Sequence, residues 1–134
     1  MNLRGVILGT RLALEPMRRS GGGAVVNTAS GGAFVPLPPQ AVYVATKAGI
    51  VHFTRSCKPL EDSHGVRVSC VCPGLVATDM VQETGIDGPA LWLQPIIDGV
   101  EMLSPEDIAA SVVELIRDPK SAGEVVTVGN APRS

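Results

Sequence analysis

Three residues have the types and the spacing for proton transfer: Ser30, Tyr43 and Lys47. Tyr43 and Lys47 stand four positions apart in a segment with a helical pattern, so their side chains share one face, a turn apart. Tyrosine is a poor base at neutral pH because its pKa is about 10. A nearby ammonium favours the phenolate and lowers that pKa, and the phenol can then exchange a proton with a substrate oxygen.

Ser30 adds a hydroxyl at the end of an apolar strand, and the ligand crevices of α/β proteins form where such strands end. Its hydroxyl is suited to hydrogen-bond the same substrate oxygen. A Tyr-x-x-x-Lys pair by itself is more often a surface pair on a helix. Three facts favour the catalytic interpretation: Tyr43 is the only tyrosine, Ser30 lies thirteen residues before it, and a second strand soon ends in VCPGLVATDM.

Hydrophobic periodicity and turn residues predict the elements that must position these side chains. Helices are expected at 3–18, at 41–57 and from Ser104-Pro105-Glu106-Asp107 to near Pro119, strands at 24–27, 66–72 and 125–128, a loop at 28–40 and an irregular segment at 74–103. The last helix should turn an inner face of four apolar residues to the core: Ile108, Val112, Leu115 and Ile116. The order α-β-α-β-α-β, with connections suited to parallel crossovers, predicts a single α/β domain over 1–134.

The composition narrows the classes of function. The chain is 45% hydrophobic and 18% charged, and its mean hydropathy is +0.26. Two explanations fit this apolar content: strands covered on both faces, or surface meant for a partner or for chain that is absent here. A net charge of −2 without a basic cluster argues against nucleic-acid binding. No apolar run reaches the roughly 20 residues of a membrane span and no signal peptide is recognisable, so we expect a cytoplasmic protein with no membrane partner.

Three cysteines are present, and Cys70 and Cys72 fall on one face of the expected strand 66–72. We interpret them as small buried side chains, because no second pair of ligands lies nearby to complete a metal site. No metal site is predicted. Asn27, at the end of the first strand, is expected to hydrogen-bond to the backbone.

Four segments together resemble the short-chain dehydrogenase/reductase family, in order and in register: NLRGV at 2–6, GAVVNTAS at 23–30, YVATKAG at 43–49 and PGLVAT at 73–78. A looser match follows at GEVVTV, residues 123–128. The resemblance implies a partial Rossmann-like, doubly wound parallel sheet of about three strands with flanking helices. It also implies an oxidoreductase that uses NAD or NADP and moves hydride between the nicotinamide and a secondary alcohol or ketone.

The resemblance also assigns catalytic roles. Tyr43 would be the general acid/base, and Lys47 would lower its pKa and hold the nicotinamide ribose. Ser30 would position the carbonyl or alcohol of a small-molecule substrate. Asn2 matches the family's helix asparagine, which holds a water in a proton relay through the lysine; a plain helix N-cap explains Asn2 about as well.

Further roles concern the cofactor and the substrate. Pro73, Gly74 and Thr78 would border the nicotinamide, with Thr78 near its carboxamide; an N-cap role for Thr78 is the alternative. Residues 78–104 would form a substrate lid. Three lid residues are candidates for the pocket, although ordinary packing accounts for them as well: Met80, Val81 and Trp92.

The sequence also departs from the family pattern. The family begins with a strand, a Gly-rich turn and a helix that bind the pyrophosphate, and this βαβ half is missing here. The first strand is therefore expected to leave an unpaired sheet edge. One hypothesis is an active oxidoreductase; the alternative is a truncated, non-catalytic fragment that acts through oligomerisation or subunit pairing. Helices 3–18 and 41–57 match the family's subunit contacts, which predicts a homo-oligomer, a dimer or tetramer.

Overall fold

The structure, a computed structural model, describes residues 2–133 and is built on three parallel strands. They run in the spatial order β1-β2-β3. Their bounds are β1 Gly23–Thr28, β2 Val66–Pro73 and β3 Val125–Val128. The register pairs Gly23 with Val66 and Thr28 with Val71, and then Cys70 with Val125 and Pro73 with Val128. The predicted α/β class and the partial, three-stranded Rossmann-like sheet are confirmed.

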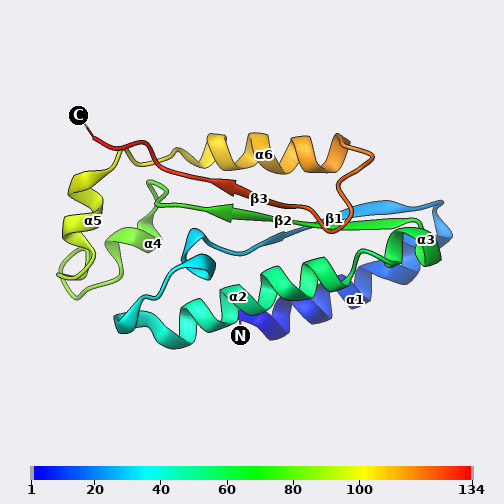
Figure 1. Cartoon of the computed structure of the whole chain (residues 1–134), viewed down its shortest axis with the longest axis horizontal. Helices are drawn as coiled ribbons and strands as arrows, with labels where there is room; N and C mark the ends of the chain where they lie inside the picture. The colour runs from blue at the N-terminus through cyan, green and yellow to red at the C-terminus, as the bar shows by residue number, and fades with distance from the viewer. Residues whose placement is uncertain (1, 134) are drawn as a thin grey trace.

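Helices cover both faces of this sheet, as Figure 1 shows. α1 (Asn2–Arg19) and α2 (Ala41–Ser56) lie on one face, and α6 (Pro105–Arg117) lies on the other. The central strand β2 is consequently buried on both faces, with Val68 and Val71 fully covered. The high apolar content of the chain is thus explained in part by a strand that has no solvent face.

Close packing of two glycine turns fixes the starts of β1 and β2. Gly22 ends the turn after α1 with φ +117°, and Gly65 ends the segment before β2 with φ +67°. A Cβ on Gly22 would lie 2.6 Å from the Gly65 carbonyl oxygen, whose lone pairs also accept a hydrogen bond from the Gly23 N–H at 3.1 Å. Only glycine combines that positive φ with that approach of two backbones.

Several short helices lie in segments where the sequence predicted none. The segment after Pro59 forms α3 (Leu60–His64), and the segment predicted as irregular contains α4 (Asp79–Gln82) and α5 (Gln94–Gly99). The loop 28–40 contains two 3-10 turns, η1 (Gly31–Phe34) and η2 (Pro38–Gln40). Helices of four to six residues are too short to show a hydrophobic period, which is why the pattern did not reveal them.

One predicted core residue is wrong. Leu115 of α6 is buried as expected, but Ile116, the next residue, is 47% exposed. Consecutive residues point about 100° apart on a helix, and the covered stripe of α6 includes Leu115 but leaves Ile116 at its exposed border. Ile116 instead contributes its backbone carbonyl, which accepts a hydrogen bond from the Arg67 guanidinium at 2.9 Å.

The expected free edge of the sheet is present. Within residues 2–133, β1 hydrogen-bonds to β2 alone, and its other edge carries no strand. Among the same residues, none of the helices combines the length and the apolar character that crossing a bilayer requires.

Candidate active site

The carboxyl ends of the three strands meet at one edge of the sheet, and the candidate catalytic residues gather there. In Figure 1 the β2 and β3 arrows point toward α4 and α5, so the segment expected to form the lid lies beyond this edge. Backbone bonds continue the strand pairing past the strand ends: the Ala29 N–H donates to Val71 O at 2.9 Å and the Gly74 N–H to Val128 O at 2.8 Å. Parallel α/β sheets place ligand crevices at such an edge.

Tyr43 and Lys47 lie together on the first turns of α2. The Lys47 ammonium is 5.6 Å from the centroid of the Tyr43 ring, and its Nζ donates a hydrogen bond to Thr28 O at 3.2 Å. The last residue of β1 therefore anchors the lysine beside the tyrosine. Burial lowers the pKa of Lys47 from its ordinary value, while the nearby thiols of Cys70 and Cys72 act in the opposite direction. Both residues are half-buried.

Ser30 stands two residues beyond the end of β1 and caps the η1 turn. Its Oγ accepts a hydrogen bond from the Gly32 N–H at 3.1 Å. Since this bond uses a lone pair of the oxygen, the hydroxyl hydrogen can still be donated to a substrate oxygen. The η1 turn packs on α2, where a Cβ on Gly32 would lie 3.4 Å from the Val44 side chain, next to Tyr43 in sequence. The structure thus brings the Ser30 loop against the helix of Tyr43 and Lys47.

Asn2 is the first residue of α1 and is exposed. Its neighbour Leu3 packs on Gly49 of α2, where a glycine Cβ would meet the leucine methyl carbon at 3.0 Å. The start of α1 therefore lies beside α2, two residues past Lys47. This location is compatible with a relay through the lysine and equally with a role at the helix start.

Pro73 is the last residue of β2, and Gly74 begins the turn that follows it. Gly31, next to Ser30, faces this turn: a Cβ on Gly31 would lie 3.4 Å from Pro73 O. The turn is therefore a direct neighbour of the Ser30 loop. Thr78 lies farther out and is exposed; it occupies the N-cap position of α4 but makes no capping bond, and its Oγ1 donates to Val76 O at 3.4 Å.

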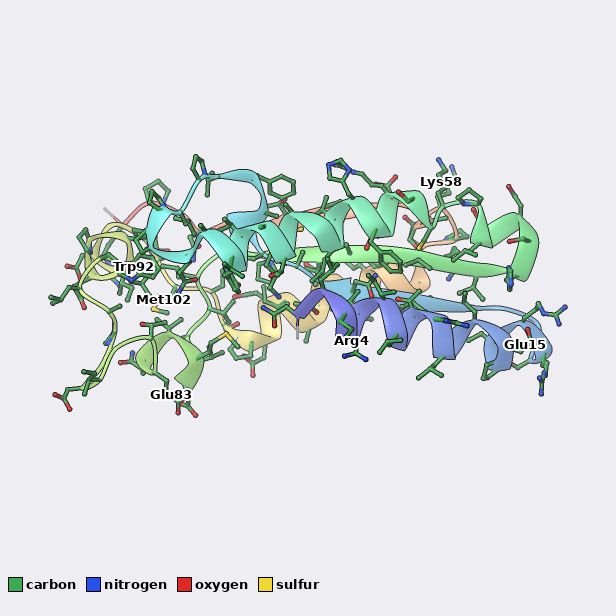
Figure 2. All side chains as sticks on the ribbon, turned by 90° about the horizontal axis from the view of Figure 1, so that it is seen from below. Arg4, Glu15, Lys58, Glu83, Trp92 and Met102 are labelled. Atoms are coloured by element: carbon green, nitrogen blue, oxygen red, sulfur yellow. The ribbon has the colours of Figure 1, made fainter. Side chains whose placement is uncertain are left out.

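The lid segment leaves the sheet after Ala77 and returns at Leu103. A parallel bridge between Val76 and Leu103 closes its base, with the Ala77 N–H donating to Leu103 O at 2.8 Å. Of the three candidate pocket residues, Met80 is 73% exposed, Val81 is buried and Trp92 is half-buried. Figure 2 places Trp92 and Met102 at the same end of the molecule, within this lid region.

The sequence interpretation missed one residue of this edge, Asn130. It follows β3, and its side-chain amide bonds to Leu75, beyond β2, and to Glu101, at the end of the lid. The signal that could have found it is the one that identified Ser30: a small polar residue directly beyond the carboxyl end of an apolar strand.

Asn27 has a different role from the one expected. Its side chain bonds to two threonine hydroxyls rather than to the backbone: Nδ2 donates to Thr54 Oγ1 at 3.0 Å, and Thr10 Oγ1 donates to Asn27 Oδ1 at 3.4 Å. All three residues are buried. This network joins α1, β1 and α2, and it fixes the helix that carries Tyr43 against the strand that leads to Ser30.

Cys70 and Cys72 lie beneath the site. Both are fully buried, as expected of small core side chains, and their Sγ atoms are 4.0 Å apart. A hydrogen bond with Cys72, together with burial, raises the pKa of the Cys70 thiol well above its usual range. Cys70 therefore remains protonated and acts as an apolar contact under α2, where it packs with Ile50 and Val51.

An open apolar groove of about 350 Å³ lies between the 32–38 loop and α2. Val44, Ala45 and Ala48 line it, whereas Tyr43 and Lys47 do not. It adjoins the candidate site, since the Gly32 N–H bonds to Ser30 Oγ and Val44 follows Tyr43 in sequence.

The side chains at the strand edge fit the nicotinamide end of a dinucleotide. Within residues 2–133, the Lys47 ammonium uses one of its three hydrogens on Thr28 O. The others can be donated to ribose hydroxyls, and a phenol and a serine hydroxyl stand on the neighbouring segments. The donor set suits a sugar and a polar substrate oxygen.

Known proteins resemble this chain in both sequence and fold. A family model described as short chain dehydrogenase matches residues 1–87. The cyclopentanol dehydrogenase of Comamonas sp. is 35% identical over 124 residues, which cover 90% of this chain and 49% of that protein. The 15-hydroxyprostaglandin dehydrogenase (NAD(+)) of Bos taurus is 33% identical over 140 residues, which cover 96% of this chain and 53% of that protein.

The fold comparison agrees with the sequence comparison. The crystal structure of acetoin dehydrogenase from Enterobacter cloacae matches with a TM-score of 0.76 at 26% identity, covering 95% of this chain and 50% of that one. The chain spans about half the length of the curated relatives it matches. By its motifs, its fold and these relatives, the chain belongs to the short-chain dehydrogenase/reductase family.

Proposed function

We propose that this chain carries the catalytic residues and the nicotinamide side of an oxidoreductase that interconverts a secondary alcohol and a ketone with NAD or NADP. The observation that supports it most is the placement of Lys47. Its ammonium is 5.6 Å from the Tyr43 ring centroid and is anchored to the end of β1. A cation held there by the fold is already in place when a ligand binds at the strand edge, so it need not reorganise during the reaction.

In the oxidation direction, the phenolate oxygen of Tyr43 accepts the proton of the substrate hydroxyl. Ser30 donates a hydrogen bond to the same substrate oxygen, which remains bound as a carbonyl once the C–H bond has broken. Lys47 lies beside Tyr43 and, with Asn2, would carry the proton away from Tyr43 after each turnover. A bound nicotinamide supplies the hydride acceptor in this direction and the hydride donor in the reverse.

The cofactor would be held by the same edge. Lys47 donates to the ribose, and Pro73 and Gly74 border the nicotinamide from the turn after β2. Thr78, at the start of the lid, approaches the carboxamide. The nicotinamide and its ribose are common to NAD and NADP, and these residues would contact only that part of the cofactor. Both cofactors are therefore included in the proposal.

Residues 78–104 act in this proposal as the lid over a small-molecule alcohol or carbonyl substrate. The closed base at Ala77 and Leu103 supports it, because both ends of the segment are fixed side by side at the strand edge. Met80 is the first candidate for substrate contact because it is 73% exposed on the lid. Val81 is buried and serves packing within α4.

The single tryptophan of the chain, Trp92, provides the test because it lies in the proposed lid. NADH and NADPH are titrated separately into the purified chain while the fluorescence of Trp92 is recorded. Saturable quenching with micromolar affinity is expected for at least one of them. Lys47→Met should weaken that binding about tenfold or more, because it removes a charged donor. His52→Asn changes an exposed side chain of α2 and is the matched control. This variant should bind NADH and NADPH as the wild type does.

Failure of both nucleotides to bind at millimolar concentration would contradict this function for the chain. It would favour a second candidate, a non-catalytic family member that acts by pairing with another subunit. The free edge of β1 supports this alternative, since unpaired strand edges promote association.

We also propose that the protein is a homo-oligomer, a dimer or a tetramer, through the outer face of α1 and α2. Leu8, Leu12 and Val42 support this proposal, since these apolar side chains are 42%, 76% and 79% exposed. Analytical ultracentrifugation should detect an oligomer that Leu12→Glu weakens. A strictly monomeric wild-type protein at high concentration would contradict it.

A further inference from the structure

Asn130 connects three segments at the edge of the sheet that are far apart in sequence. Its Oδ1 accepts a hydrogen bond from the Leu75 N–H at 2.7 Å, and its Nδ2 donates to Leu75 O at 2.8 Å and to Glu101 O at 2.9 Å. One side chain thus binds the turn after β2 and the end of the lid. Because one neighbour is a donor and two are acceptors, they fix which way the amide faces.

The same place is where the lid is anchored. The Leu103 N–H donates to Leu75 O at 2.9 Å, so Leu75 O is shared between the returning lid and Asn130. On the far side, the Glu101 N–H donates to Ala131 O at 2.9 Å. The lid therefore ends on a small network whose centre is the Asn130 amide.

The packing leaves no room to rearrange this network. A Cβ on Gly74 would overlap Asn130 Oδ1, and the Gly74 N–H donates to Val128 O at 2.8 Å. The turn that carries Pro73 and Gly74 is held by its backbone to β3 and by Leu75 to Asn130. A displacement of this turn must move Asn130, and a displacement of Asn130 must move Glu101.

We propose that Asn130 is a positioning residue that couples the Pro73–Gly74–Leu75 turn to the substrate lid. The proposal rests on the proposed function, in which this turn borders the nicotinamide. Cofactor bound against the turn fixes Leu75, Leu75 fixes the Asn130 amide, and the amide fixes the return of the lid at Glu101. Asparagine suits the task because it supplies one acceptor and two donors from a short side chain.

The hydrogen bonds of Asn130 to Leu75 and Glu101 are called the clamp. Amide hydrogen exchange of the full chain, measured first without nucleotide, tests whether the clamp holds the base of the lid closed. Asn130→Ala should speed exchange about tenfold at Ala77 and Leu103, whose amides do not bond to Asn130 but depend on the closed lid base. Ser121→Ala is the control. It removes another buried side-chain partner, the acceptor of the Arg67 Nε bond at 3.3 Å, at the opposite end of β3.

A second variant perturbs the network by steric overlap instead of by removing a hydrogen-bonding group. Gly74→Ala removes no hydrogen-bonding group but pushes a methyl group into the Asn130 amide, and it should release the same two amides. If either variant folds and leaves exchange at Ala77 and Leu103 as in the wild type, or if Ser121→Ala accelerates them equally, the clamp is refuted.

Exchange with NADH added then tests the coupling. In the wild type and in Ser121→Ala, NADH should slow exchange at Leu103 severalfold; in Asn130→Ala it should not. Equal protection of Leu103 by NADH in Asn130→Ala would overturn the coupling. If NADH changes no amide in any form, the proposed function fails, while the nucleotide-free measurement still decides the clamp.

Discussion

Substitution of Asn27 by alanine should destabilise the fold because two buried hydroxyls lose their partner at once. Asn27 is 7% exposed, Thr10 3% and Thr54 0%, so water does not replace the missing amide. A buried polar group left without a partner costs about 1–3 kcal/mol. The 3.4 Å bond from Thr10 is long, and a helical threonine can turn its hydroxyl back to its own helix. We therefore expect a total loss of about 2–4 kcal/mol.

A double-mutant cycle with Thr54→Val makes the test specific to the network. Thr54→Val alone leaves the Asn27 amide short of one acceptor and should cost about 1–2 kcal/mol. In the double variant that amide is gone as well, so its cost should fall below the sum of the two single costs by about 1 kcal/mol. Urea unfolding, followed by circular dichroism and analysed with a common m-value, gives the free energies of unfolding of the wild type and the three variants.

Ser56→Ala is the control for this cycle. It removes an exposed hydroxyl of the same helix, whose Oγ donates to His52 O at 2.9 Å, and should change stability by less than about 0.5 kcal/mol. A loss below about 0.5 kcal/mol for Asn27→Ala, or costs that simply add in the double variant, would refute the network as the link between α1, β1 and α2.

Two further predictions concern the glycine turn before β1 and the N-terminal cap of α6. Gly22→Ala should cost roughly 1–3 kcal/mol in urea unfolding, because its φ of +117° and the Gly65 oxygen both exclude a Cβ; an unchanged midpoint would contradict the close turn packing. Hydrogen bonds from the backbone and hydroxyl of Ser104 lower the pKa of Asp107 from its ordinary 3.8. The Asp107 carboxylate contributes its full stabilisation of the fold when the pH is above the ordinary pKa. That stabilisation is lost as the pH falls through the lower pKa of the folded state. Asp107→Asn should therefore melt below the wild type at neutral pH, and the difference should shrink in acid.

The main elements were predictable because their patterns are strong. β2 is buried on both faces and consists mostly of Val and Cys, interrupted by Arg67 and Ser69, and α6 has a full capping box, with Ser104 Oγ accepting from the Asp107 N–H at 3.2 Å. The short helices α4 and α5 were not predictable in this way. They have no hydrophobic pattern of their own, and Leu93, just before α5, is buried although its neighbours are not.

The residues of the candidate site were likewise predictable where their partners are close in sequence and not where the partners are distant. Tyr43 and Lys47 are local to one helix, so their spacing alone predicted their proximity. Asn130 and Asn27 act on partners 55 and 27 residues away, and no local pattern specifies such pairs before the sheet is assembled. Their discovery depended on the parallel register, which brings three strand ends to one edge.

The most direct test of the proposed catalysis is the rate of alcohol-dependent NAD(P) reduction by the wild-type protein and by Tyr43→Phe, with His52→Asn as the control. Tyr43 is the proposed general acid/base, so removal of its hydroxyl should lower the rate about 10²- to 10⁴-fold while His52→Asn retains the wild-type rate. A Tyr43→Phe protein that folds, binds NADH and keeps its rate within about threefold of the wild type would contradict the central claim.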